Sequence, residues 1–339
     1  MPTRPRRIAT SLLIETAILA AQAAHDAMTE HLHALEEDPE AVRNEFTRLH
    51  MQSGTASRKG MLALDHLAEA ACRTRFQDFS EDLQFVGEES LSGFSAWGPK
   101  RYCVLVDMVD GTDLLEMGIN LWCSAIIIYD QYEDQIIASV VGTPSGQVFY
   151  AHEGSNRAFV RGEHEYELFG CSDVKTLANA RICFYGQKFE RLIGAIGSDA
   201  FQRGWSRLEG AAKDTARIYN FAGNPMMVKL ANRPKGDDNN ILTGDVDAVF
   251  EIAGQQVHDM APGAFIAMKA GAYMCDLQGV EITMSGLSSL LKNPKQRVSY
   301  VIASTKELAE EIVQLFGNGS IEEPVSPSGA AAQHRASSV

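Results

Sequence analysis

The first part of the chain alternates apolar and polar residues at helical spacing. Residues 8–35 and 58–77 each repeat apolar positions every three or four residues, and a polar stretch of mixed charge separates them. This pattern predicts two amphipathic helices. The spaced apolar positions of the first segment are Ile8, Leu12 and Leu19, with Ile14 and Ile18 four apart beside them.

Strand-like apolar runs follow the two helices. The runs are RYCVLVDM at 101–108, CSAIIIYD at 123–130, QIIASVVG at 135–142 and QVFYAH at 147–152, with a shorter RAFV at 157–160. The turn residues TPSG separate 135–142 from 147–152, so we expect these two runs to pair as a hairpin.

The second half of the chain alternates strand and helix patterns. We expect strands at 180–186, 246–252 and 298–303, and helices at 188–196, 221–231, 259–270 and 306–316. The tail beyond about residue 322 is rich in Ser, Pro, Gly and Ala, which predicts disorder.

The segment NRPKGDDNN at 232–240 is polar and has no regular pattern. We interpret it as a solvated surface loop inserted between regular elements. The alternative is that Arg233 or Lys235 reaches a second phosphate group, although Asp237 and Asp238 would weaken such binding.

The richest local motif is VLVDMVDGTD at 104–113, where an apolar run ends in two carboxylates three residues apart. The structural alternative is a hairpin turn at Asp110 and Gly111 with two solvated aspartates. Acids at 107 and 110 do not have the alternating spacing of an EF-hand, and Met108 takes the place of the nucleophile in an aspartyl-phosphatase DxDGT motif. What remains is a DxxDGT motif that can hold metal and phosphate together.

Two further segments carry acids that could complete such a site. FVGEES at 85–90 delivers Glu88 and Glu89 after a short apolar stretch. VHDMAPG at 257–263 places Asp259 where an apolar helix is expected to begin, and a helix start attracts anions through its unpaired N–H groups.

In this order the motifs GEES, DMVDGT and HDMAPG resemble those of the inositol monophosphatase family, which is lithium-sensitive, magnesium-dependent and related to fructose-1,6-bisphosphatase. The resemblance covers roughly residues 10–315. It implies a layered α/β/α/β/α sandwich with an α+β lobe over 1–170, an α/β lobe over 171–320 and a tail over 321–339. It also implies a homodimer.

Carried over position by position, the resemblance implies a metal site made of four carboxylates and one carbonyl. The Gly111 and Thr112 N–H groups would bind phosphate, and Asp65 together with Thr112 would orient the attacking water. Glu88 would serve both as ligand and in catalysis. The implied metal ligands are Glu88, Asp107, Asp110, Asp259 and the backbone carbonyl of Val109.

Two of the transferred roles have ordinary structural alternatives. Asp65 could be a surface acid of an amphipathic helix. Glu251 resembles the family position that accepts hydrogen bonds from sugar or inositol hydroxyls, but it could equally be a strand-end glutamate facing solvent. Tyr219 and Asn224 are candidates to border the leaving group.

Several neighbours of the motif acids depart from the family pattern. Met108 replaces a proline and leaves the turn less pre-organised, while Asp113 and Leu114 stand where Thr and Asn are common. The extra charge of Asp113 could repel a phosphomonoester or recruit another cation. His258 replaces a tryptophan and Pro262 an alanine, which could alter the packing around Asp259. No acid of the site is lost.

The chemistry of phosphate hydrolysis explains why acids should gather in this way. Like charges at short range would push protons onto some of the carboxylates unless cations held them together. The resemblance implies two or three Mg²⁺ ions per site, with Mn²⁺ able to substitute and Li⁺ or Ca²⁺ expected to inhibit. Such ions neutralise the phosphate and turn water into a nucleophile.

Composition fits an enzyme of this kind and excludes some other classes. The 339 residues are 45% hydrophobic, enough for a substantial core, and no segment has the pattern of a membrane span. The formal net charge of -14 argues against general binding to nucleic acid or to an anionic membrane.

The N-terminal segment and the cysteines both predict a cytoplasmic protein. The start MPTRPRR resembles that of a signal peptide, but Glu15 and the helical spacing behind it favour a first helix of the folded protein. The six cysteines are widely spaced without a CxxC pair, which indicates reduced thiols in a cytoplasmic protein.

We therefore expect a hydrolase: a magnesium-dependent phosphatase that acts on inositol monophosphate or a similar polyol or sugar phosphate by metal-activated water. Fructose-1,6-bisphosphatase or 3',5'-bisphosphate nucleotidase activity is the alternative within the class. A non-catalytic metal-binding interaction protein is the alternative outside it, motivated by Met108, Asp113 and His258.

Overall fold

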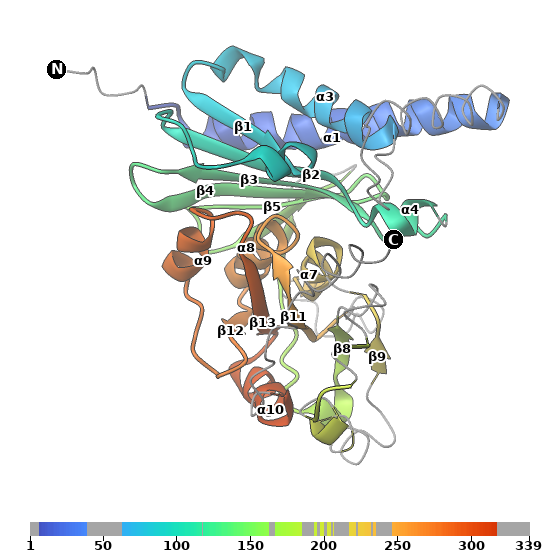
Figure 1. Cartoon of the computed structure of the whole chain (residues 1–339), viewed down its shortest axis with the longest axis vertical. Coiled ribbons are helices and arrows are strands. Elements are labelled where there is room, and N and C mark those ends of the chain that lie inside the picture. The colour runs from blue at the N-terminus through green and yellow to red at the C-terminus, as the bar shows by residue number, and fades with distance from the viewer. Residues whose placement is uncertain are drawn as a thin grey trace, which may run out of the picture.

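The protein is built of five alternating layers (Figure 1). The computed structural model describes residues 7–38, 63–116, 118–162, 167–184, 193–194, 197–199, 202–204, 206, 217–221, 223–231, 233–234 and 246–316. Helices α1 (Thr10–Glu37) and α3 (Ala63–Arg75) cover an eight-stranded sheet, and α7 (Asn224–Leu230), α8 (Ala261–Lys269) and α9 (Met284–Leu290) lie between it and a five-stranded sheet. Helix α10 (Lys306–Phe316) packs on the far side of the second sheet. The layered α/β/α/β/α fold is confirmed.

The eight-stranded sheet has the order β1-β2-β3-β4-β5-β6-β7-β10. Strand β1 runs parallel to β2, and the other neighbouring pairs are antiparallel. The expected hairpin is confirmed as β4 paired with β5. The strands are β1 (Leu83–Gly87), β2 (Tyr102–Asp110), β3 (Cys123–Asp130), β4 (Gln135–Gly142), β5 (Val148–His152), β6 (Ala158–Arg161), β7 (Glu167–Gly170) and β10 (Arg233–Pro234).

Strand β10 corrects the expectation of a loop throughout 232–240. Arg233–Pro234 pairs antiparallel with β7 and so extends the first sheet with residues from the second half of the chain. Two residues are too few for a strand pattern in the sequence, and the free edge of β7 decides the pairing. Residues 235–240 lie outside the described part of the chain.

The five-stranded sheet has the order β12-β13-β11-β8-β9. Its central strand β11 is antiparallel to β13 and parallel to β8. The short strands β9 and β12 and the helix α9 were not expected from the sequence. The strands are β8 (Arg181–Phe184), β9 (Arg217–Tyr219), β11 (Ala248–Gln256), β12 (Tyr273–Cys275) and β13 (Arg297–Ala303).

Short helical segments connect several of the strands and helices. The short helix α4 (Thr112–Glu116) follows β2, and 3₁₀ turns occupy η1 (Gln77–Phe79), η2 (Glu88–Gly93) and η3 (Leu177–Asn179). Apart from residues 193–194, the helix expected at 188–196 lies outside the described residues, as does the tail beyond residue 316.

Helix α1 is confirmed, but the prediction of which of its residues face the sheet was partly wrong. Leu12 and Leu19 are 48% and 41% exposed, although Ile8 is buried. Alanine lets the helix backbone approach the sheet closely, and the Cβ of Ala21 lies only 3.4 Å from where a Cβ on Gly142 of β4 would be. The small side chains therefore face inward and displace the leucines to the flanks. The buried residues of the helix include Leu13, Ala17, Ile18, Ala20, Ala21, Ala24 and Met28.

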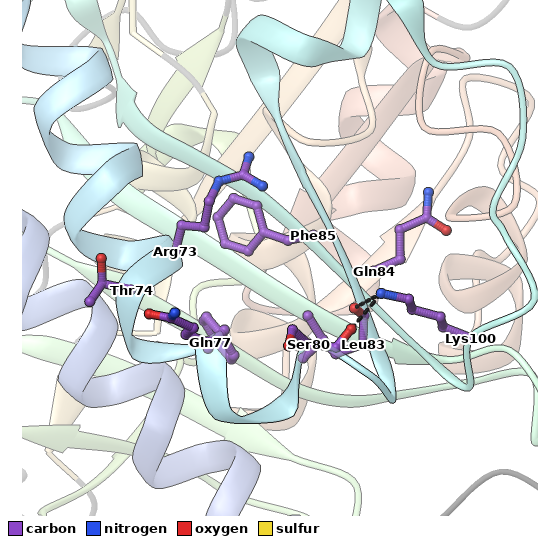
Figure 2. A pocket seen from close by; sticks show the side chains of 9 residues that line it. Arg73, Thr74, Gln77, Ser80, Leu83, Gln84, Phe85 and Lys100 are labelled. Atoms are coloured by element: carbon purple, nitrogen blue, oxygen red, sulfur yellow. Dashed lines mark hydrogen bonds between the residues drawn. The ribbon is translucent and has the colours of Figure 1, made fainter.

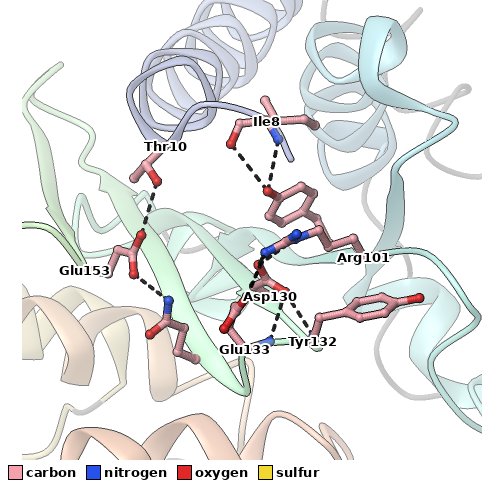
Figure 3. A network of polar contacts seen from close by, with 9 residues as sticks. Ile8, Thr10, Arg101, Asp130, Tyr132, Glu133 and Glu153 are labelled. Atoms are coloured by element: carbon pink, nitrogen blue, oxygen red, sulfur yellow. Dashed lines mark hydrogen bonds and ion pairs between the residues drawn. The ribbon is translucent and has the colours of Figure 1, made fainter. Parts of the chain in front are cut away.

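A buried polar network secures the beginning of β2 (Figure 3). Arg101 donates from Nε to Asp130 Oδ2 over 2.8 Å, and their side chains are only 8% and 2% exposed. The Tyr102 hydroxyl accepts a hydrogen bond from the backbone N–H of Ile8 over 3.1 Å. These contacts join β2 to the end of β3 and to the start of α1, so the strand that carries the motif acids is held at its opposite end.

All six cysteines are free, and all except the half-buried Cys171 are buried. Burial raises the pKa of the Cys103 and Cys183 thiols to about 12, which keeps them protonated and unreactive near neutral pH. No helix in the described part of the chain is long and apolar enough to cross a membrane.

Candidate active site

Strand β2 carries both acids of the DMVDGT motif, and an irregularity in its pairing brings them to one face. Residues three apart in a regular strand point to opposite faces. Here Asp107 pairs with Ala125 and Asp110 with Cys123, so β2 contains one more residue than β3 between these pairs. The extra residue is a β-bulge, and consecutive Met108 and Val109 both pack in the core beneath α1 and α3.

The bulge corrects the expected local structure. The sequence suggested that β2 gives way to a turn at the two aspartates, whereas the strand continues to Asp110. Both carboxylates therefore face the middle helical layer. Met108, which stands in place of a proline, is buried, and its carbonyl accepts a hydrogen bond from the Ser124 hydroxyl over 2.8 Å. This bond from β3 holds the bulge without a proline.

Side chains of the motif also hold the turn that follows. The Thr112 hydroxyl donates to the Val109 carbonyl over 2.9 Å, and the Val109 N–H donates to Asp107 Oδ1 over 3.2 Å. Gly111 has φ +103, and a Cβ there would lie 3.2 Å from the Leu121 carbonyl oxygen. Glycine is therefore required at this position.

Strand β1 delivers Glu88 to the same end of the sheet. β1 is parallel to β2, and its last residue, Gly87, pairs with Val106. Glu88 therefore follows the strand beside Asp107. A Cβ on Gly87 would lie only 2.0 Å from a carboxylate oxygen of Glu69 on α3, so the end of the Glu69 side chain would have to move if a larger residue stood here.

The second half of the chain contributes Asp259 at the start of α8, as the sequence predicted. Asn224, at the start of α7, connects this segment to β2. Its backbone N–H lies 3.1 Å from both Asp110 Oδ2 and the Asp259 carbonyl oxygen. Its side chain donates to the His258 carbonyl over 2.9 Å and accepts from the Gly263 N–H over 2.8 Å. Asn224 is fully buried, and its hydrogen bonds connect the end of β2 at Asp110 to the segment at 258–263.

Four side chains from three segments converge into one cluster. Ligand atoms of Glu88, Asp107, His258 and Asp259 all lie within 4.8 Å of one another. Asp110 is adjacent, because the Asn224 N–H lies 3.1 Å from both Asp110 Oδ2 and the Asp259 carbonyl oxygen. Three of the four carboxylates that the resemblance implies are thus found together, with a histidine among them.

The electrostatics of the cluster match a site for cations. Burial, followed by the charges of Glu88 and Asp110, raises the pKa of Asp107 well above its ordinary value. Burial and the charges of Asp259 and Glu88 raise the pKa of Asp110 to about 8. The carboxylates therefore repel one another, and divalent cations would relieve this repulsion. Hard oxygen donors of this kind suit Mg²⁺.

His258 is the site residue whose role sequence reasoning missed. Its side chain is 1% exposed, and Nε2 lies 2.8 Å from Asp259 Oδ1 and 3.7 Å from Glu88 Oε1. Burial alone would lower the pKa of His258, but the charges of Asp259 and Asp107 and the close polar contacts with the Asp259 and Glu88 carboxylates outweigh it and raise the pKa well above its ordinary value. The available signal is a histidine directly before a motif aspartate, which the sequence alone does not distinguish from a change in packing.

The proposed roles of Asp65 and Glu251 in binding water and substrate stay predictions. Asp65 is half-buried in the first turn of α3. Glu251 is fully buried within β11, where its Oε1 accepts a hydrogen bond from the Ala253 N–H over 2.7 Å. A solvent-facing glutamate at a strand end is therefore the wrong interpretation, because β11 continues five residues beyond it to Gln256.

A separate cavity of about 510 Å³ lies against the outer edge of β1 (Figure 2). Its two cationic side chains already have protein partners: Arg73 pairs with Glu69 and lies over the Phe85 ring, and Lys100 donates to the Ser80 and Leu83 carbonyls. None of the clustered acids lines this cavity. It is therefore distinct from the candidate active site.

Solved structures with a similar fold show which proteins this chain resembles. No protein-family model and no curated protein matches the sequence. SuhB of Mycobacterium tuberculosis is 18% identical with a TM-score of 0.58, covering 91% of this chain and 96% of its own. An inositol monophosphatase of Zymomonas mobilis is 16% identical with a TM-score of 0.60, covering 91% and 99%.

A third structure is inositol monophosphatase II of Staphylococcus aureus with inositol monophosphate bound. It is 16% identical with a TM-score of 0.59, covering 89% of this chain and 93% of its own. These similarities show that the chain has the inositol monophosphatase fold over most of its length, as the three motifs predicted.

Proposed function

Starting from the inositol monophosphatase fold, we propose that this protein is a Mg²⁺-dependent phosphomonoesterase acting on inositol monophosphate or a similar polyol or sugar phosphate. The observation that carries the proposal is the convergence of the buried Asp107 of β2 with the half-buried Glu88, which follows β1, and Asp259 at the start of α8. Such an arrangement is costly for a protein without cations, since burial and repulsion both oppose the ionised form.

In this proposal Glu88, Asp107, Asp110 and Asp259 hold the metal, together with the Val109 carbonyl. Bound magnesium supplies positive charge that activates water and neutralises phosphate oxygens. The Val109 carbonyl already accepts a hydrogen bond from the Thr112 hydroxyl, and a carbonyl oxygen has a second lone pair available for a cation.

Other residues of the chain bind and orient the reactants. The Gly111 and Thr112 N–H groups bind phosphate oxygens, and the Thr112 hydroxyl and Asp65 orient the attacking water. Glu251 accepts hydrogen bonds from hydroxyl groups of the leaving polyol, and its Oε1 also accepts the Ala253 N–H. Substrate phosphate is thereby placed in line with the water.

A substrate panel tests class, cofactor and substrate together. Phosphate release is measured with and without Mg²⁺ on inositol 1-phosphate, fructose 1,6-bisphosphate and adenosine 3',5'-bisphosphate. We expect Mg²⁺-dependent release, fastest with inositol 1-phosphate. Preference for either bisphosphate would overturn the proposed substrate, and metal binding without turnover of any panel member would overturn the proposed activity.

The resemblance also supports proposals about inhibition and assembly, and the six free cysteines support a proposed cytoplasmic location. We expect millimolar Li⁺ to inhibit phosphate release, and Ca²⁺ to compete with Mg²⁺. A homodimer is tested by the molar mass of the protein in light scattering. A cytoplasmic location is tested by fractionating cells that express the full chain.

A further inference from the structure

His258 lies inside the cluster of carboxylates, where the inositol monophosphatase motif has a tryptophan. The histidine side chain is 1% exposed, and Nε2 lies 2.8 Å from Asp259 Oδ1. This distance is that of an ion pair, but neither ring nitrogen has the geometry of a hydrogen bond to any described residue. A buried polar ring with no hydrogen bond needs an explanation, because burying such a group carries a free-energy cost.

The positions of the ligand atoms provide that explanation for Nε2. Ligands at right angles around one cation, each about 2.1 Å from it, lie about 3 Å apart. The 2.8 Å between His258 Nε2 and Asp259 Oδ1 fits this spacing, and Glu88 Oε1 lies 3.7 Å from the same nitrogen. Atoms that lie close together without hydrogen-bonding geometry are expected when all of them face a common cation.

We propose that His258 Nε2 is a direct ligand of the metal held by Glu88, Asp107 and Asp259, and that this mixed nitrogen and oxygen site favours a divalent transition metal such as Mn²⁺ over Mg²⁺. The inference rests on the proposed function, because it concerns the same site, and it revises which divalent ion that site prefers. Magnesium prefers oxygen donors and octahedral geometry, whereas imidazole nitrogen suits transition metals. Replacing tryptophan with histidine adds a ligand and removes none.

A different arrangement would place a charged imidazolium among the carboxylates as a permanent substitute for one cation. The two arrangements predict opposite effects when the ring nitrogen is removed. If His258 is a ligand, the site loses a donor and binds Mn²⁺ more weakly. If His258 is a substitute for a cation, its removal leaves more negative charge and strengthens binding of Mn²⁺ and Mg²⁺ alike.

The first measurement uses the unaltered protein without substrate. Pulsed electron paramagnetic resonance of bound Mn²⁺ detects magnetic coupling to a directly ligated ¹⁴N nucleus, and labelling histidine with ¹⁵N changes that signal. We expect a histidine ¹⁴N coupling in the full chain. A Mn²⁺ spectrum without nitrogen coupling would overturn the proposal, whether or not any variant folds.

The second measurement compares metal affinities by calorimetry in His258→Phe, with His152→Phe as the matched control. His152 lies on β5 and has a ring nitrogen without a hydrogen-bond partner among the described residues, but it does not belong to the metal cluster. We expect His258→Phe to weaken Mn²⁺ binding by at least about 10-fold with a smaller effect on Mg²⁺. Equal weakening of both ions, or stronger binding of both, would contradict the proposal.

Both measurements are independent of phosphatase activity. If Mn²⁺ shows histidine coupling but no phosphate ester is hydrolysed, the metal ligand is correct and the proposed function is wrong. If esters are hydrolysed while the Mn²⁺ spectrum lacks nitrogen coupling, the function is correct and the ligand assignment is wrong.

Discussion

Asn224 donates its backbone N–H to Asp110 Oδ2 over 3.1 Å, across 114 positions of sequence. The same N–H lies 3.1 Å from the Asp259 carbonyl oxygen, so one residue joins the two segments that carry the motif acids. The site is therefore assembled at a junction between the two halves of the chain, and its geometry depends on their packing.

The Asp110→Asn variant should lose nearly all phosphate release at saturating Mg²⁺, because a neutral amide holds a divalent cation poorly. The fold should persist, since the amide oxygen can still accept the Asn224 N–H. Steady-state phosphate release measures the loss, and circular dichroism checks folding. Asp26→Asn, on the exposed side of α1, is the matched control and should retain full activity. Wild-type rates in a folded Asp110→Asn variant would exclude this metal ligand.

The stability of the metal-free protein should fall as the pH rises toward about 8. The pKa of Asp110 rises from its model-peptide value of 3.8 to about 8 on folding, so the folded state binds more protons than the unfolded state between these values. Stabilisation from the protonated carboxyl is present at low pH and is lost as the pH rises through the folded-state pKa. Thermal unfolding in a chelator at pH 6 and pH 8 measures this effect.

Bound divalent metal should reverse the trend, because cations stabilise the ionised carboxylates. The rise in melting temperature on adding Mg²⁺ should therefore be larger at pH 8 than at pH 6. A metal-free protein whose melting temperature increased over this range would contradict the proposed electrostatics.

Replacing Asn224 with alanine should destabilise the protein by about 3 kcal/mol, because the His258 carbonyl and the Gly263 N–H would lose their buried hydrogen-bond partners. Phosphate release should also fall, since Asp259 would be less firmly positioned. Urea unfolding measures the change, with the exposed Asn156→Ala as control, for which we expect less than about 0.5 kcal/mol. Equal stability of the two variants would show that this junction is not needed for folding.

Removing Asp130 should be costly because it leaves Arg101 buried without its main partner. Breaking a buried ion pair costs about 3–5 kcal/mol. The exposed pair of Lys175 with Glu307 offers a control, and Lys175→Ala should cost less than about 1 kcal/mol. Denaturant unfolding midpoints of Asp130→Ala and Lys175→Ala compare the two losses of stability. Equal midpoints for the two variants would contradict the prediction.

Much of the fold could be predicted from local pattern. The β4 and β5 hairpin follows from two apolar runs around TPSG, and α8 begins just after Asp259 as expected. Strands β9 and β12, with three residues each, are too short for a repeating pattern. The apolar side of α1 was partly misassigned because alanines, not leucines, allow close contact with β4.

Sequence alone determined the chemistry that the site can offer, because GEES, DMVDGT and HDMAPG bring the acids, the glycine and the threonine within short stretches of chain. Tertiary structure decided how these groups meet. The bulge that turns Asp107 and Asp110 to one face depends on pairing with β3, and the contacts of His258 and Asn224 depend on packing between distant segments. Such relationships arise only when the chain folds, since no local periodicity encodes the distance between residues more than a hundred positions apart.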